Sequence, residues 1–397
     1  MKRGSKIWLA TMLSYADRFV AFAFPLLVLK WLGRPDTYAA VEYVLSLSLI
    51  LATFFDAGLG SYVLYHSRIS RNAQLTTTRT QQAYLPIYLL QLIAIAVSVV
   101  LCYLAVQPSI ELDLIVLGIT RACALTVIRL TTQLLILHGR PAVAPLLSLS
   151  HWLLSAAAFA LPSSANTLSF VTVFFGASIL VMVGLSALAW LRRIGPISSQ
   201  GLTHLRDAFV WGWPILLAAA ASMLVMNYSK VYAYSQLPTH EMIGFTFWLR
   251  IFSIIQLSHV ALMSVLSLQI YESSSPGIIH DNLRRYAGYL AVPAVVSAAI
   301  ALIAPSIGQD LPRLPLTAMA AIGTYILMWC AGAYLENYLT RDSRNVRVLV
   351  SSIIASSVYA GTLMFAPARS AAALATIMCI SAATYLALLV HSIKRNI

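Results

Sequence analysis

Apolar residues fall into long runs along this chain, separated by short polar segments. The runs cover residues 7–32, 39–65, 83–106, 112–137, 142–161, 168–191, 209–234, 242–270, 286–305, 315–339, 347–366 and 370–393. A helix that crosses a bilayer needs about 20 predominantly apolar residues. A membrane-spanning barrel would instead show short strands of alternating polarity. The pattern therefore predicts an all-α integral membrane protein with about 12 transmembrane helices.

The spacing of these runs repeats once along the chain. Adding 205 to the bounds of the run 39–65 gives 244–270, which lies within a few residues of the run 242–270. An even number of helices in each repeat gives both halves the same orientation and implies a pseudo-two-fold axis along the membrane normal. We predict two pseudo-symmetric six-helix lobes around a central cleft, residues 1–197 and 198–397. Chance spacing of evenly distributed helices is the alternative.

Composition excludes several classes of protein. Of the 397 residues, 60% are hydrophobic and 10% are charged, whereas soluble domains carry about 25% charged residues. A soluble enzyme, a disordered chain and a nucleic-acid-binding domain are therefore poor interpretations, and we expect no nucleic-acid partner. The four cysteines lie inside apolar runs and form no CxxC motif. We expect no disulfide, no metal site and no cofactor.

The positive charges predict how the chain is oriented in the membrane. Asp17 and Arg18 interrupt the first apolar run, which we interpret as an uncleaved span rather than a signal peptide. With the N-terminus in the cytoplasm, 17 of the 26 Lys and Arg residues fall in cytoplasmic segments and four on the other side. Short cytoplasmic loops are enriched in Lys and Arg. We therefore predict that both termini are cytoplasmic.

Five basic residues are left over (26 − 17 − 4 = 5), and all five lie within apolar runs: Arg18, Arg121, Arg129, Lys230 and Arg250. A charge near the centre of a spanning helix costs about 2.5–3.5 kcal/mol on insertion scales. Such residues face a protein interior or a water-filled cavity, or they extend to the surface when they lie near a helix end. We predict that these cations line a cleft between the lobes. Internal pairing with Asp17, Asp56 or Glu336 is the alternative.

Two stretches resemble a known family. Pro25–Gly60 reads PLLVLKWLGRPDTYAAVEYVLSLSLILATFFDAGLG, and Trp211–Ile255 reads WGWPILLAAAASMLVMNYSKVYAYSQLPTHEMIGFTFWLRIFSII. They are similar to the Wzx-like polysaccharide exporters of the multidrug/oligosaccharidyl-lipid/polysaccharide superfamily. The first has the family's leucine-rich helix end, its tyrosine and its closing Asp-x-Gly. In the second, Ser229 precedes Lys230, so an Asp–basic pair that the family often has is absent.

The resemblance implies a flippase with 12 helices that works by alternating access. Members of this family move undecaprenyl-pyrophosphate-linked oligosaccharide, such as an O-antigen or exopolysaccharide repeat unit, from the cytoplasmic to the periplasmic leaflet. For such a substrate, arginine is well suited because its planar fork binds phosphate through two parallel hydrogen bonds. The candidates for binding pyrophosphate are Arg18, Arg121 and Arg250, with Arg129 as an approach site from the inner leaflet and Lys230 nearer the outer surface.

Further residues are candidates for sugar contact and for ion coupling. Hydroxyl, amide and aromatic side chains suit carbohydrate, and those near the interior cations are Tyr15, Asn227, Tyr228, Tyr232 and Thr246. Each is also compatible with packing against lipid or protein. Asp17 and Asp56 are the ion-coupling candidates, because acids inside a membrane can relay protons. An ion pair is the alternative for both acids.

Rival functions remain within the same class of membrane protein. A drug or cation exporter of the same superfamily would favour acids in the cleft, whereas the charges predicted nearest the membrane centre are basic. A membrane polysaccharide polymerase or glycosyltransferase is disfavoured because no large outer loop and no HExxH or GxSxG motif is present. For a flippase we expect a bacterial inner-membrane location. The expected partners are the lipid-linked oligosaccharide, membrane lipids, a polysaccharide polymerase and a chain-length regulator.

Overall fold

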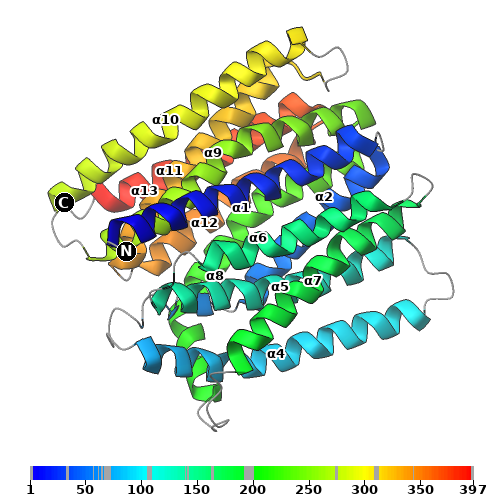
Figure 1. The fold of residues 1–397 in the computed structure, drawn as a ribbon. Helices are drawn as coiled ribbons and strands as arrows, with labels where there is room; N and C mark the ends of the chain where they lie inside the picture. Colours follow the sequence, from blue (N-terminus) through cyan, green and yellow to red (C-terminus); the bar gives the residue numbers. More distant parts are fainter. Residues whose placement is uncertain are drawn as a thin grey trace. The chain divides into compact units, whose positions relative to one another are not determined.

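The computed structural model describes most of the chain. The described residues are 3–32, 35–56, 58–60, 62–63, 66, 73–104, 110–138, 140, 143–161, 165–191, 201–272, 276–307, 313–342 and 344–394. Within these ranges every regular element is a helix (Figure 1). The predicted all-α class is therefore confirmed.

The helices follow the predicted runs closely. The first six runs correspond to α1 (Arg3–Leu32), α2 (Pro35–Phe55), α4 (Ala73–Leu104), α5 (Ile110–Leu137), α6 (Val143–Ser155) continued by the 3₁₀ turn η1 (Ala156–Ala160), and α7 (Thr167–Leu191). The last six correspond to α8 (Gly201–Gln236), α9 (Thr239–Glu272), α10 (Pro276–Ile307), α11 (Leu316–Arg341), α12 (Asn345–Phe365) and α13 (Ala371–Lys394). Among the described residues, nine helices are long and apolar enough to cross a membrane.

Three helices begin well before their apolar runs. The runs start at residues 83, 209 and 286, whereas α4, α8 and α10 start at Ala73, Gly201 and Pro276. The added turns are polar, as in Gln74–Gln82 of α4. An apolar run measures the part of a helix that lipid or a core covers, and it does not register polar turns that continue the same helix beyond the membrane.

The second predicted span, 39–65, is too long as a single helix. Helix α2 ends at Phe55, Asp56 lies in a turn, and Gly58 has φ 79°, in the left-handed region. The Oδ2 atom of Asp56 accepts a hydrogen bond from the backbone N–H of Gly60 at 3.1 Å. Glycine adopts this backbone conformation without steric cost, and the carboxylate binds a donor that the broken helix leaves without an acceptor.

The described chain forms two compact units, Met1–Leu216 and Leu217–Ile397. The division falls inside α8, so residues 201–216 of this helix belong to the first unit. The predicted lobe boundary lies at 197/198, before this helix. That boundary concerns the sequence repeat, which begins with α8, and it stays a prediction.

The repeat is visible in the packing inside each unit. In the first unit, a Cβ added to Gly118 of α5 would lie 2.7 Å from Cδ2 of Leu47 in α2. In the second, a Cβ added to Gly323 of α11 would lie 2.9 Å from Cε1 of Phe252 in α9. Both residues of the first pair map onto the second when 205 is added (118 + 205 = 323; 47 + 205 = 252). The same helix crossing uses glycine in both units, which chance spacing does not explain.

A second contact also repeats, between the starts of α2 and α7 in the first unit and of α9 and α13 in the second. Thr37 Oγ1 lies 3.1 Å from Thr167 Oγ1, which joins the starts of α2 and α7. Adding 204 to both gives Glu241 and Ala371, where Glu241 Oε2 accepts the backbone N–H of Ala371 at 2.6 Å. In the second unit the contact thus caps the first turn of α13, where a carboxylate also interacts favourably with the helix dipole.

We expect Glu241→Ala to lower the free energy of unfolding by about 0.5–2 kcal/mol, the usual cost of losing a side-chain cap. Glu241→Gln keeps an oxygen acceptor and should lose less. Thermal melting of the purified protein in detergent measures both. Equal melting temperatures for Glu241→Ala and wild type would show that this cap adds nothing to stability.

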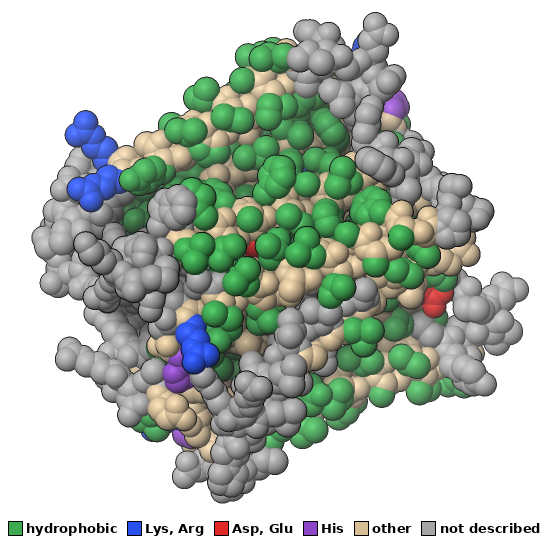
Figure 2. Space-filling view, in the orientation of Figure 1, with side chains coloured by type: hydrophobic (Ala, Val, Ile, Leu, Met, Phe, Trp, Pro, Cys, Tyr) green, Lys and Arg blue, Asp and Glu red, His purple; other side chains and the backbone are tan. Residues whose placement is uncertain are grey.

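Exposed apolar surface is concentrated on particular helices. In the most apolar stretch of α4 only 17% of the residues are buried, and in that of α10 only 22% are. In the corresponding stretch of α5, 61% are buried. Figure 2 shows hydrophobic side chains along the middle of the visible helices, with most of the basic and histidine side chains near helix ends. Apolar exposure of this kind is typical of helices that contact lipid.

Candidate functional site

Arg121 lies deep inside the first unit. Its side chain is 3% exposed, and its Nη1 donates a hydrogen bond to Ser48 Oγ on α2 at 2.5 Å. The guanidinium carbon lies 5.7 Å from the ring centre of Trp152 and 5.3 Å from that of Phe175. Two aromatic faces and one hydroxyl therefore hold the cation, and cation–π contacts of this kind are stronger when water is excluded.

The charge of Arg121 is not offset by an acid among the described residues. The charged group that acts on it is Arg129, another cation two helical turns along α5. Its Nε has no hydrogen-bond acceptor in the described part of the chain. A buried charge without a counter-charge is unfavourable, so an anion that reaches this guanidinium would be bound strongly. Pyrophosphate binding by Arg121 stays a prediction.

Arg129, in contrast, lies within the electrostatic influence of an acid. Its charge acts on the carboxylate of Asp56, at the break after α2. The amide of Gln133, one turn further along α5, is also close, because a Cβ added to Gly60 would lie 3.0 Å from Gln133 Nε2 and 3.1 Å from Asp56 Oδ2. The first unit thus brings together Asp56, Arg129 and Gln133. For this one cation, the alternative of internal pairing agrees with the structure.

The candidates on α1 differ in their surroundings. Asp17 is 3% exposed, whereas Tyr15 is 37% exposed. The backbone of Arg18 belongs to α1, but its side chain lies outside the described residues. Asp17 is therefore an interior acid of the first unit, as an ion-coupling role requires, and that role stays a prediction.

The cations of the second unit are less buried. Lys230 on α8 and Arg250 on α9 are both half-buried, and both have polar or electrostatic interactions inside the protein. Since the predicted cleft would lie between the two units, its lining by these side chains stays a prediction.

Two of the proposed sugar-contact residues direct their polar atoms to their own helices. Asn227 is 1% exposed and donates from Nδ2 to the carbonyl of Met223 at 3.1 Å. Thr246 donates from Oγ1 to the carbonyl of Met242 at 2.9 Å. These groups would have to exchange partners to bind a glycan. Sugar contact by either residue stays a prediction.

The two tyrosines near them are placed differently. Tyr228 is 43% exposed, and the centre of its ring lies 6.4 Å from that of Tyr232. The hydroxyl of Tyr232 donates to the carbonyl of Ala368 at 3.3 Å. Tyr228 therefore presents an aromatic face next to Tyr232, and of these four candidates it is the most accessible.

Sequence reasoning missed a buried polar network in the second unit. The hydroxyl of Tyr286 on α10 donates to the carbonyl of Cys330 at 3.0 Å. Because its single proton is used there, the same hydroxyl accepts from Nδ1–H of His259 at 2.5 Å. The ring of Tyr286 stacks on Tyr334 of α11, with centres 4.2 Å apart. In the sequence, this network is indicated by the tyrosines that recur inside the apolar runs.

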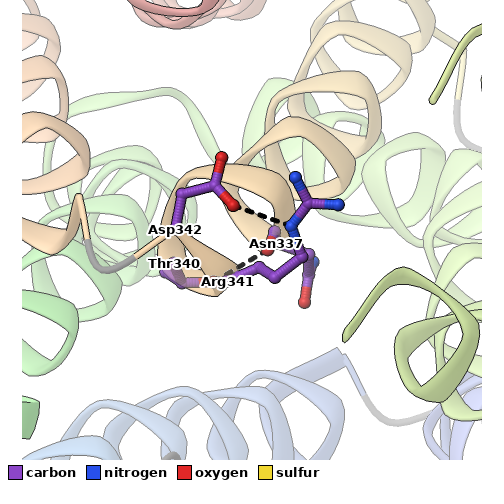
Figure 3. A network of polar contacts seen from close by, with 4 residues as sticks. All are labelled: Asn337, Thr340, Arg341 and Asp342. Atoms are coloured by element: carbon purple, nitrogen blue, oxygen red, sulfur yellow. Dashed lines mark hydrogen bonds and ion pairs between the residues drawn. The ribbon is translucent and has the colours of Figure 1, made fainter. Parts of the chain in front are cut away.

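A buried acid also lies in the second unit. Glu336 of α11 accepts a hydrogen bond from the hydroxyl of Tyr385 on α13. The sequence suggests Glu336 only as a partner for the interior cations, and gives no sign of this tyrosine. Nearer the end of α11, Arg341 Nε lies 2.8 Å from Asp342 Oδ1, and Thr340 donates to the carbonyl of Asn337 (Figure 3).

Comparison with solved structures identifies the fold. The MATE multidrug transporter DinF-BH, solved as a ligand complex, aligns with a TM-score of 0.74 at 11% identity, over 99% of this chain and 95% of its own. An outward-facing multidrug resistance MATE family transporter of the MOP superfamily aligns with a TM-score of 0.64 at 12% identity, over 100% and 96%. No protein-family profile and no curated protein sequence matches the chain.

A third structure is similar over the same extent. It is a MOP superfamily transporter from Pyrococcus furiosus whose binding pocket has reverse polarity, which suggests a different function; the TM-score is 0.62 at 11% identity, over 100% of this chain and 96% of that one. The chain therefore has the two-lobed, all-helical fold of these MATE structures, and its described helices include nine that are long and apolar enough to cross a membrane. At these identities the likeness establishes the fold and leaves the substrate open.

Proposed function

We propose that this protein is a flippase that moves undecaprenyl-pyrophosphate-linked oligosaccharide from the cytoplasmic to the periplasmic leaflet of a bacterial inner membrane. Both termini would be cytoplasmic, and the two lobes would alternate access to the substrate. A polysaccharide polymerase and a chain-length regulator would act on the delivered repeat units.

Arg121 is the observation that carries this proposal. A 97% buried guanidinium whose charge no described acid offsets is costly for the folded protein. In a transporter, an anionic substrate that binds next to Arg121 would supply the missing counter-charge and be held by it. The bidentate geometry of arginine fits phosphate better than a lysine ammonium would.

The substrate chemistry fits the remaining features. A pyrophosphate needs cations at membrane depth, a hydrated glycan needs polar and aromatic side chains such as Tyr228, and an isoprenoid tail can stay in lipid. The Pyrococcus furiosus transporter with a reverse-polarity pocket supports the idea that one MOP fold serves substrates of different charge. Because no acid among the described residues offsets the charge of Arg121, an anionic substrate is favoured at that position.

A cation or drug exporter is the second candidate. Asp17 is a buried acid in α1, and the similar DinF-BH structure is that of a multidrug transporter. An exporter of cations would gain affinity from Asp17, and Arg121 would oppose it. The two candidates therefore differ in the sign of the charge that the interior binds.

A cellular experiment tests the proposed function. Deleting the gene should cause lipid-linked oligosaccharide to accumulate on the cytoplasmic leaflet, measured with a membrane-impermeant glycan-modifying reagent on oriented vesicles. Complementation with the wild-type gene should restore exposure on the other leaflet. An unchanged leaflet distribution after deletion would remove the flippase assignment.

We expect Asp56→Asn to uncouple transport from the proton gradient. The asparagine oxygen can still accept the N–H of Gly60, so the turn after α2 should persist, while the charge that attracts Arg129 is lost. Flipping by wild type should slow when an ionophore collapses the gradient, and flipping by the variant should not respond. Asp207→Asn, at an exposed position on α8, is the matched control and should behave as wild type. A wild-type rate that ignores the ionophore would refute the coupling role.

A further inference from the structure

A second basic cluster lies in the first unit, away from Arg121. It combines His66 from the segment after α2, Arg79 from the polar start of α4, and His204 from the start of α8. Arg79 Nη1 lies 2.8 Å from His66 Nε2, and His66 Nδ1 lies 3.1 Å from Thr76 Oγ1. All three basic side chains interact electrostatically with one another. The proposed mechanism of transport uses none of them.

The contacts assign the proton on His66. An arginine N–H only donates, so His66 Nε2 is the acceptor and the ring is neutral with its proton on Nδ1, which donates to Thr76. Burial lowers the pKa of His66 from its ordinary value, and the charges of Arg79 and His204 lower it further. The cluster therefore contains one fixed cation and imidazoles that can accept protons.

The imidazole of His204 can form a further hydrogen bond. Its Nδ1 is buried and has no hydrogen-bond partner among the described residues. Arg79 has five N–H donors, and the bond to His66 uses one of them. The acid that acts on His204 is Asp207, one turn along α8 and exposed at the surface. The described groups of the cluster are thus one half-buried guanidinium, two imidazoles and the exposed carboxylate of Asp207.

We propose that Arg79, His66 and His204 form a binding site for a phosphate-bearing anion. The guanidinium of Arg79 supplies the permanent charge and a fork of donors that matches phosphate oxygens. His204 supplies a further N–H from Nδ1, the ring nitrogen that no described residue binds. Thr76 fixes the orientation of His66 on the other side of the cluster.

Binding at this site is linked to protons. A bound anion favours the charged form of each nearby imidazole, so it raises the pKa that Arg79 and burial hold down in its absence. The imidazoles then take up protons on binding, and their contribution to the affinity rises as pH falls through the histidine range. The other groups nearby do not reverse this sign: Arg206 and Asp207 on α8 are exposed, and His138 on α5 contacts Thr77 at 2.7 Å.

The proposed anion site does not include Arg121. The proposal rests on the proposed function only in where the phosphate-bearing ligand comes from. The predicted orientation places these segments on the cytoplasmic side, where lipid-linked pyrophosphate is made. A lipid headgroup and a free phosphate share the required chemistry. Titrations in the Arg121→Met background separate this site from the interior one, so loss of flipping and loss of binding are distinct results.

The test is calorimetric titration of inorganic pyrophosphate into the full-length protein in phosphatidylcholine nanodiscs. Two values of pH, about 6 and about 8, bracket the ordinary histidine pKa of about 6.5. The variants are Arg79→Gln, which removes the fixed charge, and His204→Gln, which keeps polarity but cannot gain a proton. Arg206→Gln is the control, because it removes one exposed charge from the same end of α8. Thermal melting confirms that each variant is folded.

Lowering the pH should favour binding more in wild type than in His204→Gln, since protonation of pyrophosphate itself affects both proteins equally. Arg79→Gln should weaken binding by about tenfold or more, which corresponds to about 1.4 kcal/mol, and Arg206→Gln by less than about twofold. His204→Gln should flatten the pH dependence. Repeating the titration in nanodiscs that contain phosphatidic acid identifies the source: competition indicates a lipid phosphate, and its absence a soluble one. Equal effects of Arg79→Gln and Arg206→Gln, or the same pH dependence for wild type and His204→Gln, would overturn the proposal.

Discussion

Replacing Arg121 with methionine is expected to abolish transport while leaving the protein folded and no less stable than wild type. Methionine fills a similar volume between Trp152 and Phe175. Replacing a buried ion pair with apolar side chains is commonly neutral or stabilising by about 1–4 kcal/mol, and a buried charge without a counter-charge has less attraction to lose. Ser48 keeps a hydrogen bond after the change, because its Oγ also donates to the carbonyl of Leu45 at 2.9 Å. A purely structural arginine would show the opposite result for stability.

The transport defect should be large. Losing charge-assisted hydrogen bonds to a phosphoryl group is worth about 3 kcal/mol, or roughly a hundredfold in rate or affinity. Arg121→Lys keeps the charge without the planar fork and should retain partial activity. Arg284→Met removes an exposed arginine from α10 and should flip at the wild-type rate. Flipping assays and thermal melting on the same preparations make the comparison. Near-normal flipping by Arg121→Met, or a marked fall in its melting temperature, would exclude the substrate role.

Gly58→Ala should strongly destabilise the first unit. Gly58 has φ 79°, where an added side chain costs about 1–3 kcal/mol. The new Cβ would also lie 3.0 Å from the Cα atom of Gly212 in α8, and backbone atoms cannot move aside as a side-chain end can. The turn that positions Asp56 and the first part of α8 would both be displaced, so we expect transport to fall together with stability.

Gly361→Ala is the matched control for this change. Gly361 lies in α12, and a Cβ added there meets no atom within 4 Å among the described residues. Alanine is also the better helix former, by up to about 1 kcal/mol. Thermal melting should therefore show a lower melting temperature for Gly58→Ala and an unchanged or higher one for Gly361→Ala. A similar small change in both would show that the backbone at Gly58 is not strained by a side chain.

Hydropathy predicted the helices because lipid imposes one strong rule on every spanning segment. The same rule explains the errors. The run 39–65 stays apolar through the break at Asp56 and Gly58, because the turn is buried and its one carboxylate is bound by the N–H of Gly60. The early starts of α4 and α8 were missed because polar turns outside the apolar run have no hydropathy signal.

Helix packing supports the internal repeat more strongly than the sequence does. Hydropathy indicates an offset of 205, yet residue identity is barely shared between the halves. The structure shows what is kept, namely close helix crossings such as Gly118 on Leu47 and Gly323 on Phe252. Conserved geometry with different side chains is expected when packing volume, rather than identity, is the constraint.

The candidate site was predictable only in part. Spacing along a helix identified Arg121 and Arg129 as interior cations. It could not show that Asp56 acts on Arg129 or that aromatic rings contact Arg121, because those partners come from other segments. The same limit applies to His259 and Tyr286, which meet across α9 and α10. Polarity alone suggests Asn227 and Thr246 as sugar contacts, and the structure shows that their polar atoms bind backbone carbonyls of their own helices.

The most direct test of the account is a flipping assay with purified protein in liposomes. The liposomes carry a lipid-linked pyrophosphate oligosaccharide, and an impermeant enzyme that modifies the glycan reports which leaflet holds it. Wild type should move this lipid between leaflets, Arg121→Met should not, and neither should transport a cationic dye. Transport of the dye by wild type, with no movement of the pyrophosphate-linked lipid, would contradict the account and favour a cation exporter.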